Sequence, residues 1–243
     1  MNWSDQGIIV SVRPHGETAA IVEVLTREHG RHAGLVYGGR SRRLRPVLQI
    51  GNHIEVTWKG RLAEHLGFMT VELRKSYAAS AMDDAVALAG LASMCALTRL
   101  LPERDPHPSL YDITLYVLGF LSDAVLWPAL YVRWELALLA DLGFGLELSA
   151  CASTSATEDL VYVSPRSGRA VSAGAGAPYR DRLLQLPMFL KGGCSREVTR
   201  SDVLAGLALT GHFLEARILR PRGFEFPDAR QRLNALLARA KAI

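Results

Sequence analysis

Apolar and polar positions alternate in short runs along the first 75 residues of the chain. Runs rich in Ile and Val are separated by turns that contain Gly, Pro or His, and in the clearest run Ile54, Val56 and Trp58 share one face. A period of two indicates half-buried strands. Strands are predicted over residues 7–12, 19–26, 31–37, 52–59 and 66–73. Five short strands at this spacing favour a small barrel, and an OB-type barrel fits the size, although the pattern also allows an SH3-like barrel.

From about residue 78 the apolar positions recur at helical spacing. Helices are predicted over residues 79–101, 109–126, 128–142, 198–219 and 228–241. Residues 147–180 are rich in Ser, Thr, Gly and Pro, and two short apolar runs inside them flank a Pro-Arg-Ser-Gly turn that is typical of a hairpin. We therefore predict an α+β protein with a five-stranded OB-type barrel at residues 1–77. A mostly α-helical domain follows at 78–243, with a small β insert at about 147–180.

The composition indicates the cellular compartment of the protein. No apolar run reaches the roughly 18 residues that span a bilayer, and the first residues lack the basic region and apolar core of an export signal. Cys95, Cys151 and Cys194 are an odd and scattered set, which argues against a disulfide framework. We therefore expect a cytoplasmic protein without a membrane partner.

The charge of the chain is unevenly distributed. Residues 1–75 carry 11 Lys and Arg against 7 Asp and Glu, residues 76–160 carry 3 against 11, and residues 161–243 carry 14 against 6. The modest net charge of +4 thus conceals two basic blocks around an acidic one. Blocks of like charge set up local potentials, so the two basic ends are expected to attract a polyanion.

No set of residues assembles an active site. The chain has no phosphate-binding loop, no dinucleotide fingerprint and no zinc-protease helix. His29 and His32 lie three positions apart without a further ligand pair, so structural or solvated roles are expected for both. Asp83 and Asp84 are placed at a helix N-terminus, where carboxylates stabilise the helix dipole. The sequence therefore predicts a protein that is not an enzyme.

The basic residues of the predicted barrel are more informative. Four arginines occupy six positions between two predicted strands, in a glycine-containing stretch that is too polar for a core. We interpret it as a flexible loop whose guanidinium groups can bind several phosphates, the alternative being a solvated turn. Tyr37, Trp58 and Phe68 can either stack on bases or belong to the barrel core, and the core is preferred for Trp58. The predicted DNA-binding residues are Arg13, Arg27, Arg31, Arg40, Arg42, Arg43, Arg45, Lys59, Arg61, Arg74 and Lys75.

Several short motifs follow one another in the order found in a known family. The N-terminal ones are Asp5-Gln6-Gly7-Ile8-Ile9, Gly16-Glu17, Leu25-Thr26-Arg27-Glu28-His29-Gly30, Val36-Tyr37-Gly38-Gly39-Arg40 and Trp58-Lys59-Gly60-Arg61. The later ones are Arg133-Trp134-Glu135-Leu136-Ala137-Leu138-Leu139, Leu142-Gly143-Phe144-Gly145 and Val163-Ser164-Pro165-Arg166-Ser167-Gly168-Arg169-Ala170-Val171. In this order and spacing, over almost the whole chain, they resemble the RecO family of bacterial recombination mediators.

The resemblance implies a fold and a function. Members of that family have an N-terminal OB fold, a helical domain and a small zinc-ribbon-like insert. They are not enzymes: they bind single- and double-stranded DNA, and they anneal strands coated with single-strand-binding protein. With RecR they help to load RecA. By resemblance we expect DNA, RecR, single-strand-binding protein and, indirectly, RecA as partners, and a place at the nucleoid.

The same resemblance implies a site for a protein tail and raises the question of a metal. Family members bind the acidic C-terminal tail of single-strand-binding protein at the helical domain, and the motif match places Arg133 and Trp134 there. Arg133 can instead pair with a nearby acid. Relatives that hold zinc carry four cysteines in the insert, whereas here only Cys151 and Cys194 lie in or near it. Because a structural zinc site needs four such ligands, we expect no cofactor and a lost metal site.

A second class of function stays open at this stage. The chain can be an OB-fold adaptor whose basic loop binds an acidic protein partner instead of DNA. The two classes differ in their response to salt, since DNA binding gives a steep linear fall of log affinity with log salt concentration.

Overall fold

The computed structural model describes residues 1–62, 64–191 and 197–239. The chain divides into two compact units. The first comprises Met1–Ser122 and Pro227–Leu233, and the second comprises Asp123–Phe226 and the residues from Asn234 onward. Within the described ranges, none of the helices combines the length and apolar character needed to cross a membrane.

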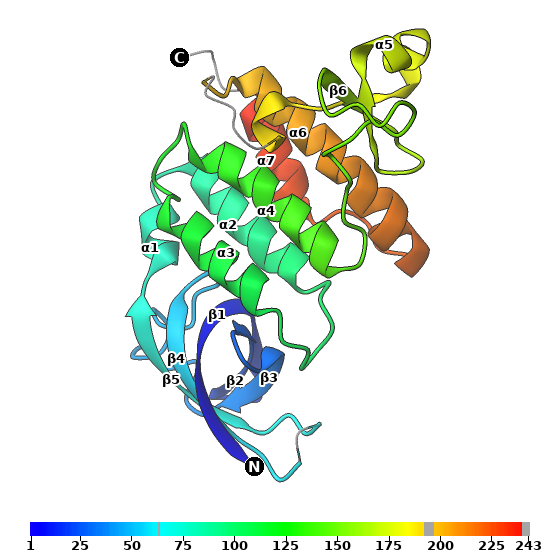
Figure 1. Ribbon diagram of the computed structural model, residues 1–243. Coiled ribbons are helices and arrows are strands. Elements are labelled where there is room, and N and C mark those ends of the chain that lie inside the picture. The colour runs from blue at the N-terminus through cyan, green and yellow to red at the C-terminus, as the bar shows by residue number, and fades with distance from the viewer. Residues whose placement is uncertain (63, 192–196, 240–243) are drawn as a thin grey trace. The chain divides into compact units, whose positions relative to one another are not determined.

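The first unit contains a closed five-stranded barrel (Figure 1). Its strands are β1 (Asn2–His15), β2 (Ala19–Thr26), β3 (Gly30–Val36), β4 (His53–Lys59) and β5 (Phe68–Lys75). The strand order around the barrel is β1-β2-β3-β5-β4. The long β1 pairs with β4 through its first half and with β2 through its second, and β3 meets β5 in parallel. This order agrees with the predicted OB-type barrel.

The barrel core is built from the inward faces of all five strands. Ile54, Val56 and Trp58 are at most 1% exposed, so the alternating face seen in the sequence is the buried one, and the preference for Trp58 as a core residue is confirmed. The indole of Trp58 donates a hydrogen bond to the carbonyl of Leu66 over 3.0 Å, which satisfies its one polar atom. A side chain at Gly34 would lie 2.4 Å from Met69, so the thioether fills the space that the glycine leaves.

Helices follow the barrel in the first unit. They are α1 (Tyr77–Ala81), α2 (Ala85–Thr98), α3 (Pro108–Gly119) and the first half of α7 (Asp228–Arg239). The single helix predicted over residues 79–101 is in fact two, because Asp84 begins a new one. Its carboxylate accepts hydrogen bonds from the backbone N–H groups of Val86 and Ala87, at 2.7 and 3.2 Å. The expected place of Asp84 at a helix N-terminus is therefore confirmed.

The second unit combines helices with a small sheet. Its elements are α4 (Trp127–Asp141), β6 (Leu160–Val163), β7 (Ala170–Ser172), α5 (Ala173–Gly176), η1 (Ala177–Arg182), β8 (Leu184–Gln185), η2 (Met188–Leu190), α6 (Arg200–Phe213), η3 (Leu214–Leu219) and η4 (Arg220–Arg222). The predicted hairpin is β6 and β7, and the two-residue β8, too short to leave a pattern, adds a third strand. Helices α4 and α6 share a buried polar contact, in which the Glu135 carboxylate accepts hydrogen bonds from Tyr131 and Thr210. The α+β class with a barrel, a helical region and a small sheet is thus confirmed.

Candidate nucleic-acid interface

The arginine segment (residues 38–46) lies in the connection from β3 to β4. The backbone winds there in successive turns, with the N–H of Arg45 donating to the carbonyl of Ser41 and the N–H of Leu48 to that of Leu44, at 3.0 and 2.8 Å. Leu44, Val47 and Leu48 pack against the barrel core. The segment is a connection between two strands, as predicted, and apolar residues three and four positions apart hold one side of it against the barrel.

The four guanidinium groups of this segment lie on its outer side. Arg40, Arg42, Arg43 and Arg45 are exposed or partly exposed. Arg40 donates a hydrogen bond to the carbonyl of Gly16, in the turn between β1 and β2, over 3.1 Å. In the described parts of the chain, no carboxylate lies within ion-pair distance of any of the four. The described residues therefore do not neutralise their charge, so each can pair with a phosphate.

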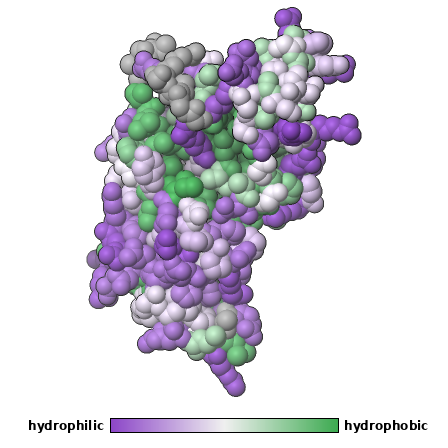
Figure 2. Space-filling view, in the orientation of Figure 1, coloured by the Kyte–Doolittle hydropathy of each residue, from purple (hydrophilic) through white to green (hydrophobic). Residues whose placement is uncertain are grey.

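Two arginines of the segment line a hollow in the surface of the first unit. The hollow has a volume of about 370 Å³ and is formed by Arg42, Arg45, Pro46, Gln49, Ser76, Ala78, Ala79 and Met82. Arg42 and Arg45 thus lie at the same concavity, where both can reach one anionic backbone. In the view of Figure 2 the surface of the barrel is mainly hydrophilic, as a polyanion-binding surface requires.

The same barrel carries an exposed aromatic pair. Tyr37 directly precedes the arginine segment, and Phe68 begins β5. Their rings stack with centroids 5.1 Å apart and planes 17° apart, yet Tyr37 is 66% and Phe68 is 48% exposed. Lys59 lies directly opposite Phe68 across β4 and β5. Two solvent-facing rings flanked by cations are the combination that single-stranded nucleic acid uses for stacking and charge neutralisation.

Arg31 and Arg13 are placed differently from what the sequence suggested. Both bind the carboxylate of Glu23, at 3.2 and 3.4 Å, and Arg99 joins them at 3.2 Å. Arg31 also donates to the carbonyl of Leu101, and its side chain is only 13% exposed. That Arg31 binds DNA stays a prediction, and its guanidinium is bound to the buried carboxylate of Glu23. Arg13 keeps an exposed side chain and shares Glu23.

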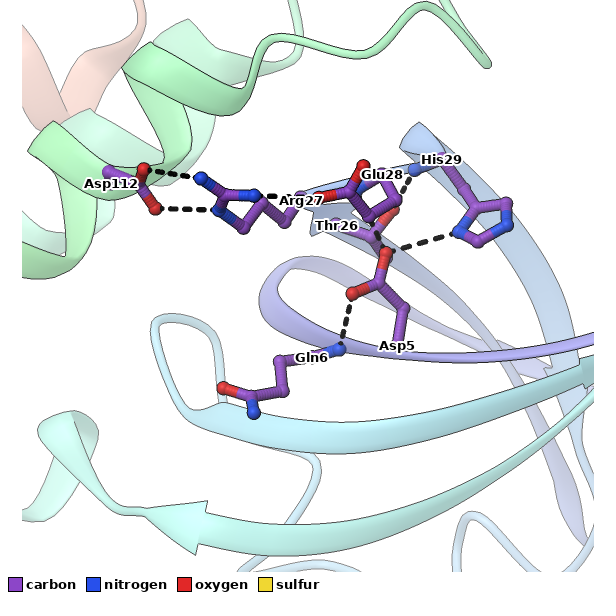
Figure 3. A network of polar contacts seen from close by, with 7 residues as sticks. All are labelled: Asp5, Gln6, Thr26, Arg27, Glu28, His29 and Asp112. Carbon is purple, nitrogen blue, oxygen red and sulfur yellow. Dashed lines mark hydrogen bonds and ion pairs between the residues drawn. The ribbon is translucent and has the colours of Figure 1, made fainter.

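Arg27 is likewise neutralised within the unit, as Figure 3 shows. It forms a two-point contact with Asp112 on α3, with both N···O distances at 3.0 Å, and an ion pair with Glu28. The hydrogen bond from Arg27 holds the pKa of Asp112 below its usual value, and Asp112 and Glu28 raise the pKa of Arg27. The contact joins the turn between β2 and β3 to α3. That Arg27 binds DNA stays a prediction, with its charge paired to two carboxylates of the same unit.

The remaining predicted cations divide into two groups. Arg74 pairs with Glu55 at 3.0 Å, and the Lys75 ammonium lies 4.8 Å from the centre of the Tyr77 ring. Burial and the nearby charges of Arg74 and Lys75 lower the pKa of the His53 imidazole. Lys59 and Arg61 are exposed and, among the residues that the structure describes, have no acidic partner. Among the described residues, the predicted cations that stay unpaired are therefore Lys59, which lies opposite Phe68, Arg61 and the four arginines of the segment.

The predicted tail site lies on α4 of the second unit. Arg133 is exposed, but its guanidinium donates to the carbonyl of Phe189, from Nε over 3.1 Å and from a terminal nitrogen as well. Trp134 is 0% exposed and packs against Tyr131 with ring centroids 5.8 Å apart. The indole of Trp134 is thus part of the core, so the prediction that it offers apolar surface to a partner does not agree with its position.

A pocket that the sequence gave no sign of lies at one end of the barrel. Trp3, His32, Trp58 and Arg104 are among its lining residues. They come from β1, β3, β4 and the connection after α2, so no motif could join them. The sequence predicts a structural or solvated role for both histidines. His32 is buried in the mouth of the barrel, while His29 lies in a turn as expected.

The cysteines do not gather into a metal site in the described ranges. Cys151 is buried in the insert, where its sulfur contacts the Ser172 hydroxyl at 3.5 Å and accepts a hydrogen bond from the Ser172 N–H at 3.3 Å. The hydrogen bonds from Ser172 and Thr154 lower the pKa of its thiol to about 6. Cys194 lies outside the described residues. No group of three His, Cys, Asp or Glu side chains in the described ranges could hold a metal ion.

We expect the purified protein to contain well under one zinc ion per chain. A chelator should leave its melting temperature unchanged, because a bound structural metal adds stability by linkage and its removal would lower that temperature. Elemental analysis and a thermal melt with and without chelator test both points. Stoichiometric zinc would contradict the prediction and require a search for His or Asp ligands.

Comparison with known proteins covers nearly the whole chain. The family model described as Recombination protein O N terminal matches residues 1–77, and the one described as Recombination protein O C terminal matches residues 82–223. The chain is 54% identical over 240 residues to the DNA repair protein RecO of Methylobacterium nodulans, covering 97% of this chain and 98% of the relative. It is 52% identical over 241 residues to that of a strain of Methylorubrum extorquens, with the same coverage. It is also 52% identical over 235 residues to that of Rhodospirillum centenum, covering 96% and 93%.

Proposed function

The chain belongs to the RecO family of DNA repair proteins, and from this premise we propose that it binds DNA as a non-catalytic mediator of recombinational repair. The observation that carries the proposal is the set of unpaired cations on the barrel that also presents the exposed Tyr37–Phe68 pair. Cations neutralise phosphates and rings stack on bases, but neither supplies a nucleophile or a general base. The proposed role is therefore to hold and present DNA, in the cytoplasm at the nucleoid.

The finer part of the proposal concerns what the protein does with DNA. We propose that it binds single- and double-stranded DNA, and that it anneals complementary strands coated with single-strand-binding protein. With RecR it helps to load RecA. Contacts from flexible guanidinium groups to phosphates carry no sequence information, so they suit a protein that must accept any strand. The aromatic pair adds an affinity for unpaired bases, which a duplex cannot satisfy.

A salt-titrated binding measurement with labelled single-stranded oligonucleotides tests the proposal. The logarithm of the affinity should fall linearly and steeply with the logarithm of the salt concentration, and the stoichiometry should grow with oligonucleotide length. The same protein should accelerate annealing of two complementary strands. A flat salt response, or no binding to DNA at all, would favour the adaptor with an acidic protein partner.

The proposed tail site gives a separate prediction. We expect Arg133→Ala to weaken binding of the single-strand-binding protein tail by roughly 10- to 150-fold, since losing one charge-assisted contact costs about 1.5–3 kcal/mol. Binding to naked DNA should be unchanged. Fluorescence anisotropy of a labelled tail peptide measures the first quantity, and a labelled oligonucleotide measures the second.

A matched control for this variant is Arg182→Ala, which removes the same charge from an exposed position of the same unit. It should leave tail binding intact. Full tail affinity in Arg133→Ala, or an equal loss of naked-DNA binding, would contradict the assignment. The tail site would then have to be sought among the basic residues of the C-terminal third.

A further inference from the structure

A pocket of about 480 Å³ opens at one end of the barrel. None of its lining residues belongs to the arginine segment. Its lining is formed by Met1, Asn2, Trp3, Glu28, His29, His32, Trp58, Arg104 and Pro106. These residues all belong to the first unit. The walls are largely aromatic, and the polar groups among them include a neutral imidazole, a guanidinium and a carboxylate.

The innermost polar group of this pocket is the imidazole of His32. It is 4% exposed, and neither of its ring nitrogens has a hydrogen-bond partner among the described residues. The rings of Trp3 and Trp58 stand edge-on to it, with centroids 5.1 and 4.9 Å away. Burial, with the charges of Arg104 and His29, lowers the pKa of His32 to about 4. At neutral pH the ring is therefore uncharged and offers one donor and one acceptor. A buried polar ring without partners is costly, and a ligand that pairs with it removes that cost.

A second unpaired donor lies in the same wall. The Nε of Arg104 is buried without a hydrogen-bond partner in the described part of the chain, although a terminal nitrogen of the same side chain donates to the carbonyl of Glu64 over 2.9 Å. Arg104 has a φ of +62°, in the left-handed region that side chains other than glycine rarely adopt. Its backbone N–H donates to the carbonyl of Arg31 over 2.8 Å, which holds it in this conformation. Strained backbone of this kind is often found where a side chain must be aimed at a ligand.

The aromatic walls of the pocket are fixed before any ligand binds. The Trp3 ring is parallel to the His29 ring, with centroids 4.1 Å apart and planes 9° apart, and it also stacks with Trp58 at 5.8 Å. His29 is held by the carboxylate of Asp5 at 3.1 Å, and that carboxylate also accepts the N–H groups of Gln6 and Glu28 (Figure 3). A site whose walls are already ordered loses little freedom when it binds a flat ring.

The pocket is joined to the proposed DNA interface across the three neighbouring strands β1, β4 and β5. Asn2 lies in its wall and opposite Lys59, which in turn lies opposite Phe68 of the aromatic pair. The N-terminal ammonium donates to the carbonyl of Gly60, the residue before Arg61. A DNA backbone that follows Lys59 and Arg61 therefore passes the rim of the pocket.

We propose that the pocket takes one unstacked nucleobase of a single DNA strand, with its edge on His32 and Arg104 and its face against the aromatic wall. This inference rests on the proposed DNA binding and adds to it a reason for preferring single strands. A nucleobase is flat and carries donors and acceptors along one edge, which matches a neutral imidazole beside an unpaired N–H. In a duplex the same edge is already paired, so the pocket stays empty.

The test replaces His32 with Phe, which keeps a ring in place and removes both nitrogens. Because two unpaired buried nitrogens are lost, the variant should be at least as stable as the wild type in thermal unfolding. Its affinity for a single-stranded oligonucleotide should fall by about tenfold, the size of effect that loss of one hydrogen bond to the base can produce. Its affinity for a blunt duplex of the same length, and the salt slope with either DNA, should be unchanged. His15→Phe, at an exposed position of the same barrel, is the matched control and should bind as the wild type does.

The outcomes separate this inference from the proposal beneath it. Unchanged single-strand affinity in a folded His32→Phe protein would overturn the base pocket, and so would an equal loss with single strands and duplex. If the wild-type protein binds neither single strands nor duplex, the proposed function itself fails.

Discussion

The variant in which Arg40, Arg42, Arg43 and Arg45 are all replaced with Ala should bind DNA of any sequence more weakly and with a much flatter salt dependence. The slope of log affinity against log salt concentration should decrease by roughly three to four units, near one for each lost phosphate contact. Between about 20 and 200 mM salt, the wild type should therefore lose roughly 10³- to 10⁴-fold more affinity than the variant. Fluorescence anisotropy with a labelled single strand at several salt concentrations measures both slopes.

A change in net charge alone must be distinguished from loss of a site. The control removes four arginines of the second unit, Arg166, Arg169, Arg180 and Arg182, and so makes the same change in total charge. This control should keep nearly the whole slope. An unchanged salt slope in the folded arginine-segment variant would show that the segment is not part of the DNA site. An equally reduced slope in both variants would mean that DNA binding depends only on the total charge of the protein.

Replacing Glu23 with Ala should lower the free energy of unfolding by about 3–5 kcal/mol, the cost of breaking a buried ion pair from one side. Glu23 is 5% exposed and binds Arg31, Arg99 and Arg13. Without the carboxylate, the guanidinium of Arg31 stays in the interior with Glu103, at 3.5 Å, as its remaining charged partner among the described residues. Chemical unfolding followed by tryptophan fluorescence measures the change, because Trp58 reports on the barrel.

The control for this prediction is Glu55→Ala. Glu55 pairs with Arg74 at 3.0 Å, but both side chains are about half exposed. An exposed pair contributes only about 0–1 kcal/mol, so this variant should unfold nearly as the wild type does. If Glu23→Ala also lowered the free energy of unfolding by less than about 1 kcal/mol, the ion pairs of Glu23 would not contribute the stability expected of a buried pair. Arg31 would then again be a candidate for DNA binding.

The strand pattern of the barrel could be predicted from the sequence with few errors. The run at residues 19–26 coincides with β2, and the face of Ile54, Val56 and Trp58 is the buried face of β4. Successive side chains of a strand point to opposite faces, one toward the core and one toward solvent, so apolar and polar residues alternate along the sequence of the strand. The first strand was predicted too short, because its start at Asn2 is polar and pairs with β4 rather than with a neighbour in sequence.

The unevenness of charge and the exposed stacking residues were also within reach of the sequence, whereas the use of each charge was not. Arg31 and Arg42 look alike in sequence, yet Arg31 is bound to Glu23 and Arg42 has no acidic partner in the described ranges. Asp112, which pairs with Arg27, and Glu23, which pairs with Arg31, come from other elements of the unit, and Asp112 is 85 positions away from Arg27. Ion pairing acts through space, so composition can count cations but cannot say which of them are free.

The sequence by itself thus determined the barrel, the helices, the insert and the family, since each depends on local period or on the order of short motifs. The tertiary structure decided three further points. It fastened the arginine segment to the barrel, placed the Trp134 indole in the core, and brought Trp3, His32 and Arg104 to one pocket. These depend on burial and on contacts between residues distant in sequence, which exist only once the chain has folded.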